Sequence, residues 1–178
     1  MSRSHKALTL EDLRRLGELA AADRECLFGR KRQTGELYRN RLFAVALGQG
    51  AALHFLDGTN GINDFNVWSF FTESTERFFP YRRRGVVDFG DPKFGVSDDS
   101  LQFVGRRVDM IGRSLKEADP GDPIGSLRRY LLQGATKPAR CLSQKAVILI
   151  EPDRLLGHIV WPIPAQQNVS TDANKRRG

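Results

Sequence analysis

The chain has 178 residues, of which 40% are hydrophobic and 28% are charged, and its formal net charge is +7. This length suits one domain with a sizeable core and is too short for two comfortable domains, and no apolar run is long enough to cross a bilayer. Composition therefore excludes a membrane span, whereas the basic surplus favours nucleic acids and polyphosphates as partners, because positive charge attracts them over long distances.

The N-terminal region predicts a helix that follows a short polar segment. Residues 1–6 lack the apolar stretch and the cleavage site of a secretory signal, so we expect a cytoplasmic protein. Thr9 has the character of a helix cap, and leucines at helical spacing continue the helix from there. Residues 29–35 combine glycines with basic side chains, which favours a basic surface loop. Cys26 and Cys141 form no zinc or redox motif, so we expect both to be reduced core residues.

The next segment predicts a strand or a buried helix, followed by a turn, a helix and a strand. Residues 42–47 form an apolar run that ends in Gly48-Gln49-Gly50, and residues 51–58 predict a short helix closed by Asp-Gly. The aromatic and β-branched residues that follow favour a strand covered on both faces. Because side chains alternate along a strand, Asp64 and Asn66 are expected to point the same way.

The stretch between residues 73 and 102 lacks a clear period, and we expect a long loop on the same side as these polar residues. It contains Arg82-Arg83-Arg84, whose guanidinium groups suit phosphate oxygens. A solvated basic loop is the alternative interpretation of this run.

Residues 103–111 return to strand character and carry Asp109 among apolar neighbours. An unpaired carboxylate in such a strand costs several kcal/mol to bury. Asp109 therefore needs either a metal ion or an ion pair with Arg107 or Arg113.

The C-terminal part predicts two helices, a last strand and a tail. Proline and glycine bound a helix over residues 122–134, and a second helix is expected over residues 137–150. Residues 155–161 favour a final strand or docking segment. The polar and charged residues 163–178 predict a flexible basic tail, so the folded domain is expected over residues 1–162.

Residues 42–71 and 103–113 resemble the core of the DNA polymerase β-like nucleotidyltransferases. In that family a small Gly-rich turn opens a helix, the next strand presents two acidic groups to metal and nucleotide, and a later strand supplies a third. The resemblance implies one α/β (α+β) domain with helices packed on a mixed sheet. It implies Mg²⁺-dependent or Mn²⁺-dependent transfer of a nucleotidyl group from a nucleoside triphosphate to an RNA, a protein or another acceptor.

The resemblance also assigns roles to individual residues. Asp64 and Asp109 are the expected catalytic carboxylates, and the expected metal ligands are Asp64, Asn66 and Asp109. The nucleotide is expected to contact the turn and the basic run, through Gly48, Gln49, Gly50, Ala51, Arg82, Arg83 and Arg84.

Two positions depart from the family pattern. Asn66 stands where a second acid is expected and offers a carbonyl oxygen without charge, and Gln49 replaces the first small residue of the turn. These departures favour an alternative function, a catalytically degenerate module that binds nucleotide, nucleic acid or protein. A plain interaction domain is a third possibility, in which Asp64 caps a turn and Asn66 is a structural polar residue.

Overall fold

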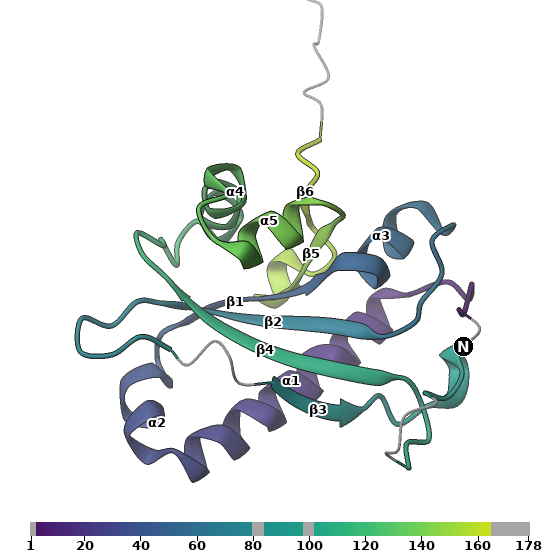
Figure 1. The fold of residues 1–178 in the computed structure, drawn as a ribbon, viewed down its shortest axis with the longest axis horizontal. Helices are drawn as coiled ribbons and strands as arrows, with labels where there is room; N and C mark the ends of the chain where they lie inside the picture. The colour runs from purple at the N-terminus through teal and green to yellow at the C-terminus, as the bar shows by residue number, and fades with distance from the viewer. Residues whose placement is uncertain (1–2, 80–83, 98–101, 165–178) are drawn as a thin grey trace, which may run out of the picture.

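A six-stranded mixed β-sheet with helices on both faces organises the chain (Figure 1). The computed structural model describes residues 3–79, 84–97 and 102–164. Within those ranges the α-helices are α1 (Leu10–Arg30), α2 (Arg32–Tyr38), α3 (Gln49–Asp57), α4 (Pro123–Gln133) and α5 (Lys137–Ser143). The strands are β1 (Leu42–Gly48), β2 (Phe65–Thr72), β3 (Arg84–Asp88), β4 (Arg107–Leu115), β5 (Val147–Glu151) and β6 (Ile159–Trp161).

The strands follow the order β3-β4-β2-β1-β5-β6 across the sheet. β2 and β4 are parallel, whereas the other neighbouring pairs are antiparallel. Because β1 ends where β2 and β4 begin, the turn into α3 and the first residues of both strands meet at one edge of the sheet, on the right of Figure 1. The expected α+β class with a mixed sheet is confirmed.

Helix α1 covers one face of the sheet and begins at a reciprocal cap. The Thr9 side chain accepts a hydrogen bond from the Asp12 amide, and the Asp12 carboxylate accepts one from the Thr9 amide. Lys93 Nζ also donates to Asp12 at 2.7 Å. Burial alone raises the pKa of Asp12, but the hydrogen bonds from Lys93 and Thr9 outweigh it and hold that pKa below its ordinary value. The cap fixes where the helix begins, and from there Leu13 and Leu16 face the sheet and are fully buried.

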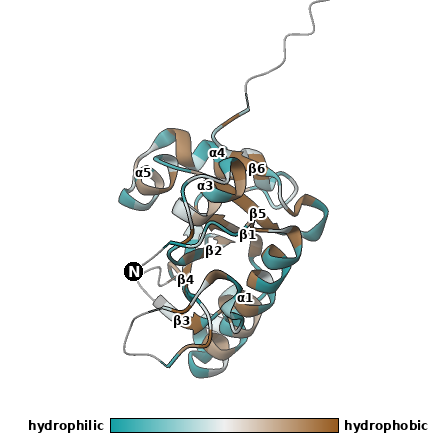
Figure 2. Ribbon diagram, turned by 90° about the vertical axis from the view of Figure 1, so that its right-hand side faces the viewer, coloured by the Kyte–Doolittle hydropathy of each residue, from teal (hydrophilic) through white to brown (hydrophobic). Residues whose placement is uncertain are grey.

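Helices α4 and α5 cover part of the opposite face. Trp68 and Phe70 of β2 pack there with Leu127 of α4 and Leu142 of α5, whereas Phe65 of β2 belongs to the cluster under α1. Figure 2 shows hydrophobic segments concentrated on the sheet and on the helix sides next to it. β2 is therefore buried on both faces, as its aromatic and β-branched sequence predicted.

The prediction of a loop over residues 29–35 was wrong, because these residues end α1 and form most of α2. The two helices approach closely at Gly35, where a Cβ atom would lie 2.9 Å from Phe28 Cβ. Tyr38, at the end of α2, is fully buried against Phe71. Tertiary packing rather than a local pattern therefore holds this short helix.

The predicted helix over residues 137–150 was also wrong in its second half. α5 ends at Ser143, and Val147–Glu151 form β5 between β1 and β6. The residues of β5 contribute alternately to the clusters on the two faces of the sheet, which suits its β-branched and apolar composition. β4 begins at Arg107, later than the strand expected from residue 103, and the predicted long loop contains β3.

The structure also bears on the expected state of the two cysteines and on the expected absence of a membrane span. Cys26 and Cys141 are free, as expected, but both are exposed and neither lies in the core. Among the described residues, no helix is both long enough and apolar enough to pass through a membrane.

Candidate functional site

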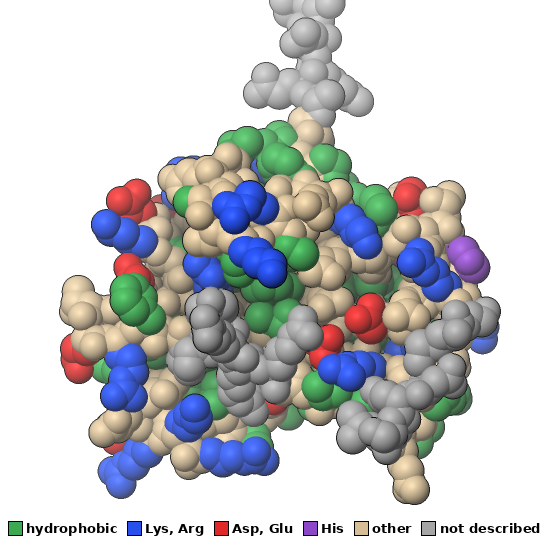
Figure 3. All heavy atoms as spheres, viewed as in Figure 1, with side chains coloured by type: hydrophobic (Ala, Val, Ile, Leu, Met, Phe, Trp, Pro, Cys, Tyr) green, Lys and Arg blue, Asp and Glu red, His purple; other side chains and the backbone are tan. Residues whose placement is uncertain are grey.

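The candidate site lies at the edge of the sheet where β1 ends and where β2 and β4 begin. Gly48 of β1 pairs with Asn66 of β2, and Asn66 pairs in parallel register with Asp109 of β4. Residues paired in this way present their side chains on the same face. That face carries α4 and α5, and Figure 3 shows acidic side chains over the adjoining ends of β2 and β4 with basic side chains close by. The structure thus brings Asn66 and Asp109 together, on the face opposite α1.

The turn from β1 into α3 has an unusual backbone. Gln49 has a φ of 63°, in the left-handed region that non-glycine residues rarely adopt, and such strain concentrates at functional sites. Its amide donates to the Ala146 carbonyl at 3.0 Å, which ties the turn to β5. Gly48 precedes it as the cap of α3, and no side chain caps this helix end. The amide groups of the first turn of α3 therefore lack a capping side chain, which is the arrangement that binds anions at helix N-termini.

Gly48 is required here by close packing. A Cβ atom at this position would lie 2.7 Å from Leu142 Cδ2 and 3.3 Å from Trp68 Nε1. Trp68 is 5% exposed, and its indole Nε1 has no hydrogen-bond partner in the described structure. A buried donor without a partner costs about 1–3 kcal/mol. The close packing of Trp68 beside the turn therefore carries this cost in stability.

Two exposed side chains from the α5–β5 region reach the same turn. A Cβ atom on Gly50 would lie 3.9 Å from Lys145 Nζ, so the ammonium group stands beside the start of α3. Gln49 Nε2 donates to Cys141 Sγ at 3.2 Å. The sequence pattern did not indicate either contact, because Lys145 was expected inside a helix that in fact ends before it. The finding places a cation next to the uncapped helix end.

Asp64 and Asn66 supply oxygen atoms at the start of β2. Asp64 immediately precedes the strand and is half-buried, and its carboxylate makes no hydrogen bond or ion pair within the described residues. Asn66 is 5% exposed, and its side-chain amide likewise forms no hydrogen bond with the part of the chain that is described. Neither side chain is among the described groups whose polar atoms are fully buried without a partner, so solvent reaches these oxygen atoms and they are accessible to a ligand.

Asp109 is paired inside its own strand. It is 4% exposed, and its Oδ1 accepts hydrogen bonds from Arg107 Nε at 3.0 Å and from Arg107 Nη2 at 2.9 Å. The predicted alternative of an ion pair with Arg107 is therefore confirmed, and Arg113 instead lies over the Tyr130 ring. A cation at Asp109 would have to displace this guanidinium group or share the carboxylate with it.

The donor set fits one divalent cation better than two. Mg²⁺ prefers oxygen ligands and usually takes one or two carboxylates together with substrate phosphates and water. Asp64 and Asp109 offer two carboxylates, and Asn66 offers a neutral carbonyl oxygen. Within the described residues, no group of three or more His, Cys, Asp or Glu side chains is arranged to hold a metal. The expected set of Asp64, Asn66 and Asp109 has only two acids, so it is not a group of that kind, and a triphosphate would have to complete the coordination.

The other predicted nucleotide contacts divide into two groups. Ala51 is in the first turn of α3, but its methyl group is buried in the core under α1, so only its backbone amide faces the helix end. Arg82 and Arg83 lie outside the described residues. Arg84 begins β3, and the position of its side chain is likewise outside the description.

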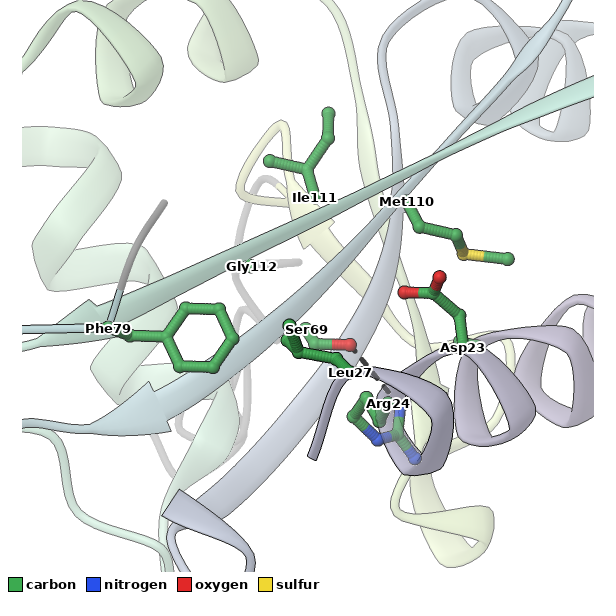
Figure 4. Close-up of a pocket in the computed structure, with 9 residues that line it drawn as sticks. Asp23, Arg24, Leu27, Ser69, Phe79, Met110, Ile111 and Gly112 are labelled. Atoms are coloured by element: carbon green, nitrogen blue, oxygen red, sulfur yellow. Dashed lines mark hydrogen bonds between the residues drawn. The ribbon is translucent and has the colours of Figure 1, made fainter. Parts of the chain in front are cut away.

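A small cavity lies between α1 and the opposite face of the sheet. It holds about 10 Å³, enough for roughly one water molecule, between α1 and the strands (Figure 4). Arg24 crosses it to donate to Ser69 Oγ at 3.2 Å and to Glu151 at 3.2 Å. These polar groups satisfy one another, so this cavity is structural.

No family model, no curated protein and no solved structure matches this chain.

Proposed function

We propose that this chain is a nucleotidyltransferase-like protein that binds a nucleoside triphosphate at the start of α3, together with one divalent cation. In this proposal it transfers the nucleotidyl group to an acceptor. The observation that carries the proposal is the register Gly48–Asn66–Asp109, which places an uncapped helix end beside two buried oxygen-bearing side chains. The partially exposed Asp64 carboxylate, which has no partner among the described residues, extends this row.

The turn and Lys145 would hold the triphosphate. Backbone amides at a helix N-terminus point outward and carry the positive end of the helix dipole, which favours phosphate oxygens. The Lys145 ammonium group beside Gly50 adds a full charge at the same place. An exposed lysine can adjust its position to a bound phosphate, because its side chain is flexible.

The cation would be held by Asp64, Asn66 and Asp109. When bound with the triphosphate, a Mg²⁺ or Mn²⁺ ion neutralises charge that develops on the phosphoryl oxygens during transfer. Arg107 neutralises Asp109 in the ligand-free protein and prevents an unpaired carboxylate in the sheet. Asn66 adds no charge, so the residues support one cation and leave a second underneutralised.

A second candidate function is binding without chemistry. The amide of Asn66 and the Arg107–Asp109 ion pair both favour it, because each reduces the negative charge available to a metal. In that case nucleotide binding depends on the turn and Lys145, and added divalent cation changes affinity little.

Thermal unfolding with nucleotide and metal separates the two candidates. A ligand present at a hundredfold excess over its dissociation constant stabilises the folded state by about 2.7 kcal/mol. We expect ATP, GTP, CTP or UTP to raise the melting temperature only when Mg²⁺ or Mn²⁺ is also present. Asp64→Asn and Asp109→Asn should abolish this shift, whereas Asp153→Asn, a change at an exposed carboxylate in the 3-10 turn after β5, should leave it intact. A shift that triphosphate produces without metal indicates the binding module instead.

The two exposed cysteines provide a test of where the triphosphate binds. Cys141 contacts Gln49, whereas Cys26 is in α1, so one thiol lies beside the proposed triphosphate and the other does not. We expect triphosphate with Mg²⁺ to slow alkylation of Cys141 severalfold and to leave Cys26 unaffected, as measured by peptide mass spectrometry. Equal rates with and without ligand at Cys141 would place the nucleotide elsewhere.

A further inference from the structure

A second polar groove lies on the same face of the sheet, at the end remote from Asp109. Its volume is about 250 Å³, and it runs between the end of β4, the segment after β2 and helix α4. This volume is below the roughly 300 Å³ at which pockets for whole small ligands begin, so the groove suits part of a larger ligand. It shares no lining residue with the row Gly48–Asn66–Asp109.

The side chains of this groove combine three cations with aromatic rings and with the two carboxylates of Glu73 and Glu117, so the cations outnumber the acids by one. Arg113, Lys116 and Arg129 line it, and Lys116 and Arg129 are exposed. The Arg113 guanidinium carbon lies 5.4 Å from the centre of the Tyr130 ring, and Phe78 stands at the rim with 72% of its surface exposed. A single exposed hydrophobic side chain is common on protein surfaces, so the relevant point is the position of the exposed Phe78 ring beside the cations of the groove.

Tyr130 is oriented by its own contacts. Its hydroxyl group forms a hydrogen bond with Thr136 Oγ1 at 3.0 Å, and burial raises the pKa of the phenol above its ordinary value despite that bond and the nearby Arg113. The phenol group is therefore protonated and neutral at physiological pH, and the Arg113 guanidinium group packs over its ring.

The groove is aligned with the candidate site along one strand. Asp109 and Arg113 are both on β4, four positions apart, and their side chains face the α4 side of the sheet. At about 3.3 Å per residue they are separated by ~13 Å. In double-stranded DNA each strand advances about 3.4 Å per nucleotide, so a strand that kept this stacked spacing would cover the distance with about four nucleotides.

We propose that this groove binds single-stranded nucleic acid and guides one end of it toward Asp109. Phe78 would stack on a base, while Arg113, Lys116 and Arg129 would contact the phosphates. Stacking on aromatic rings and backbone contacts from basic residues are how proteins hold single strands without reading their sequence. The acceptor role of the strand rests on the proposed transfer reaction, whereas binding of the strand does not.

The test is anisotropy of a fluorescent oligouridylate of about twelve nucleotides, measured with chelator and without triphosphate. A deoxyoligonucleotide of matching length distinguishes DNA from RNA as the source of the strand. We expect the parent protein to bind the single strand more tightly than a duplex of the same length. Phe78→Ala should weaken binding about tenfold, whereas Leu132→Ala, which removes another exposed apolar side chain outside the groove lining, should not.

The salt dependence gives a second, independent readout. Lys116→Gln and Arg129→Gln should each lower the slope of log affinity against log salt by about 0.7, the value for one phosphate contact to a single strand. Arg154→Gln, at an exposed position remote from the groove lining, is the charge-matched control.

Three results would overturn the inference: no binding by the parent protein, an affinity of Phe78→Ala equal to that of Leu132→Ala, or slopes for Lys116→Gln and Arg129→Gln equal to that of Arg154→Gln. Because no metal or triphosphate is present, these results bear on the groove alone. The metal-dependent thermal shift decides the proposed function separately.

Discussion

The two faces of the sheet differ in how completely their buried polar groups are paired by hydrogen bonds. Under α1 the side chains are mainly apolar, and the few polar groups satisfy one another, as Arg24 does with Ser69 and Glu151. On the opposite face, the Trp68 indole Nε1 is buried without a hydrogen-bond partner, the Asn66 amide forms no hydrogen bond with the described residues, and Asp109 depends on Arg107. The first face stabilises the fold. The second retains costly polar groups at the start of β2 and β4, which is what a binding site requires.

The largest effect is expected from a truncation under α1. Leu16 is fully buried in the cluster beneath this helix, so Leu16→Ala leaves a cavity and should lower the free energy of unfolding by about 2–5 kcal/mol. Urea unfolding measures this loss. The affinity of the folded variant for triphosphate should remain that of the parent, and a large loss of affinity would show that the two faces are not independent.

The next effect is expected at the turn into α3. In Gly48→Ala the new methyl group would lie 2.7 Å from Leu142 Cδ2, so overpacking should cost about 1–3 kcal/mol of stability and should shift the turn that is proposed to hold the triphosphate. Gly29→Ala is the control, because no atom lies within 4 Å of a Cβ placed there and alanine favours a helix by about 0.5–1 kcal/mol. Equal stability of the Gly48 variant and the parent would contradict the described packing.

Asn66→Asp sharpens the comparison between the two faces, because it adds a negative charge to the face that carries the candidate site. Without metal, a carboxylate near Asp64 and Asp109 should destabilise the fold by about 1 kcal/mol through burial and like-charge repulsion. With Mg²⁺ the variant should bind the ion more tightly than the parent does, as measured by calorimetry. Unchanged stability together with unchanged Mg²⁺ affinity would show that Asn66 faces no cation site.

The smallest effect is expected at the cap of α1. The pKa of Asp12 is lowered in the folded state, so its contribution to stability is complete above the unfolded-state pKa of about 3.9 and is lost as the pH falls through the lower folded-state value. Asp12→Asn should therefore cost about 0.5–1 kcal/mol at neutral pH, and the difference from the parent should shrink below about pH 4. Urea midpoints from pH 7 to pH 3 measure it, and a difference that stays constant with pH would contradict the cap geometry.

The sequence predicted the elements whose pattern is local. Capping and leucine spacing indicated α1, and the apolar run, glycine turn and aromatic strand indicated β1, α3 and β2. It failed where long-range contacts decide the structure. α2 depends on close approach at Gly35 and on burial of Tyr38, and β5 depends on its place between β1 and β6. The periodicity of the sequence indicates neither the packing of α2 nor the pairing of β5 with its neighbours.

The same distinction applies to the candidate site. The alternation of Asp64 and Asn66 and the isolation of Asp109 in an apolar strand are visible in the sequence, and so is the possibility that Arg107 neutralises Asp109. The register that aligns Gly48, Asn66 and Asp109 comes only from strand pairing. The sequence left open whether Lys145 faces the cleft or solvent, because its approach to Gly50 depends on where α5 ends.

The most direct test of the central claim is paramagnetic broadening of backbone amide signals by Mn²⁺ in the presence of a non-hydrolysable triphosphate. The account predicts selective broadening at Gly48, Asn66 and Asp109, at low Mn²⁺, with little effect on Ser69 and Gly112 further along the same two strands. It also predicts that Asp64→Asn removes this broadening. Broadening centred elsewhere, or none at Asn66 and Asp109, would contradict the claim that this row of the sheet binds a metal–nucleotide complex.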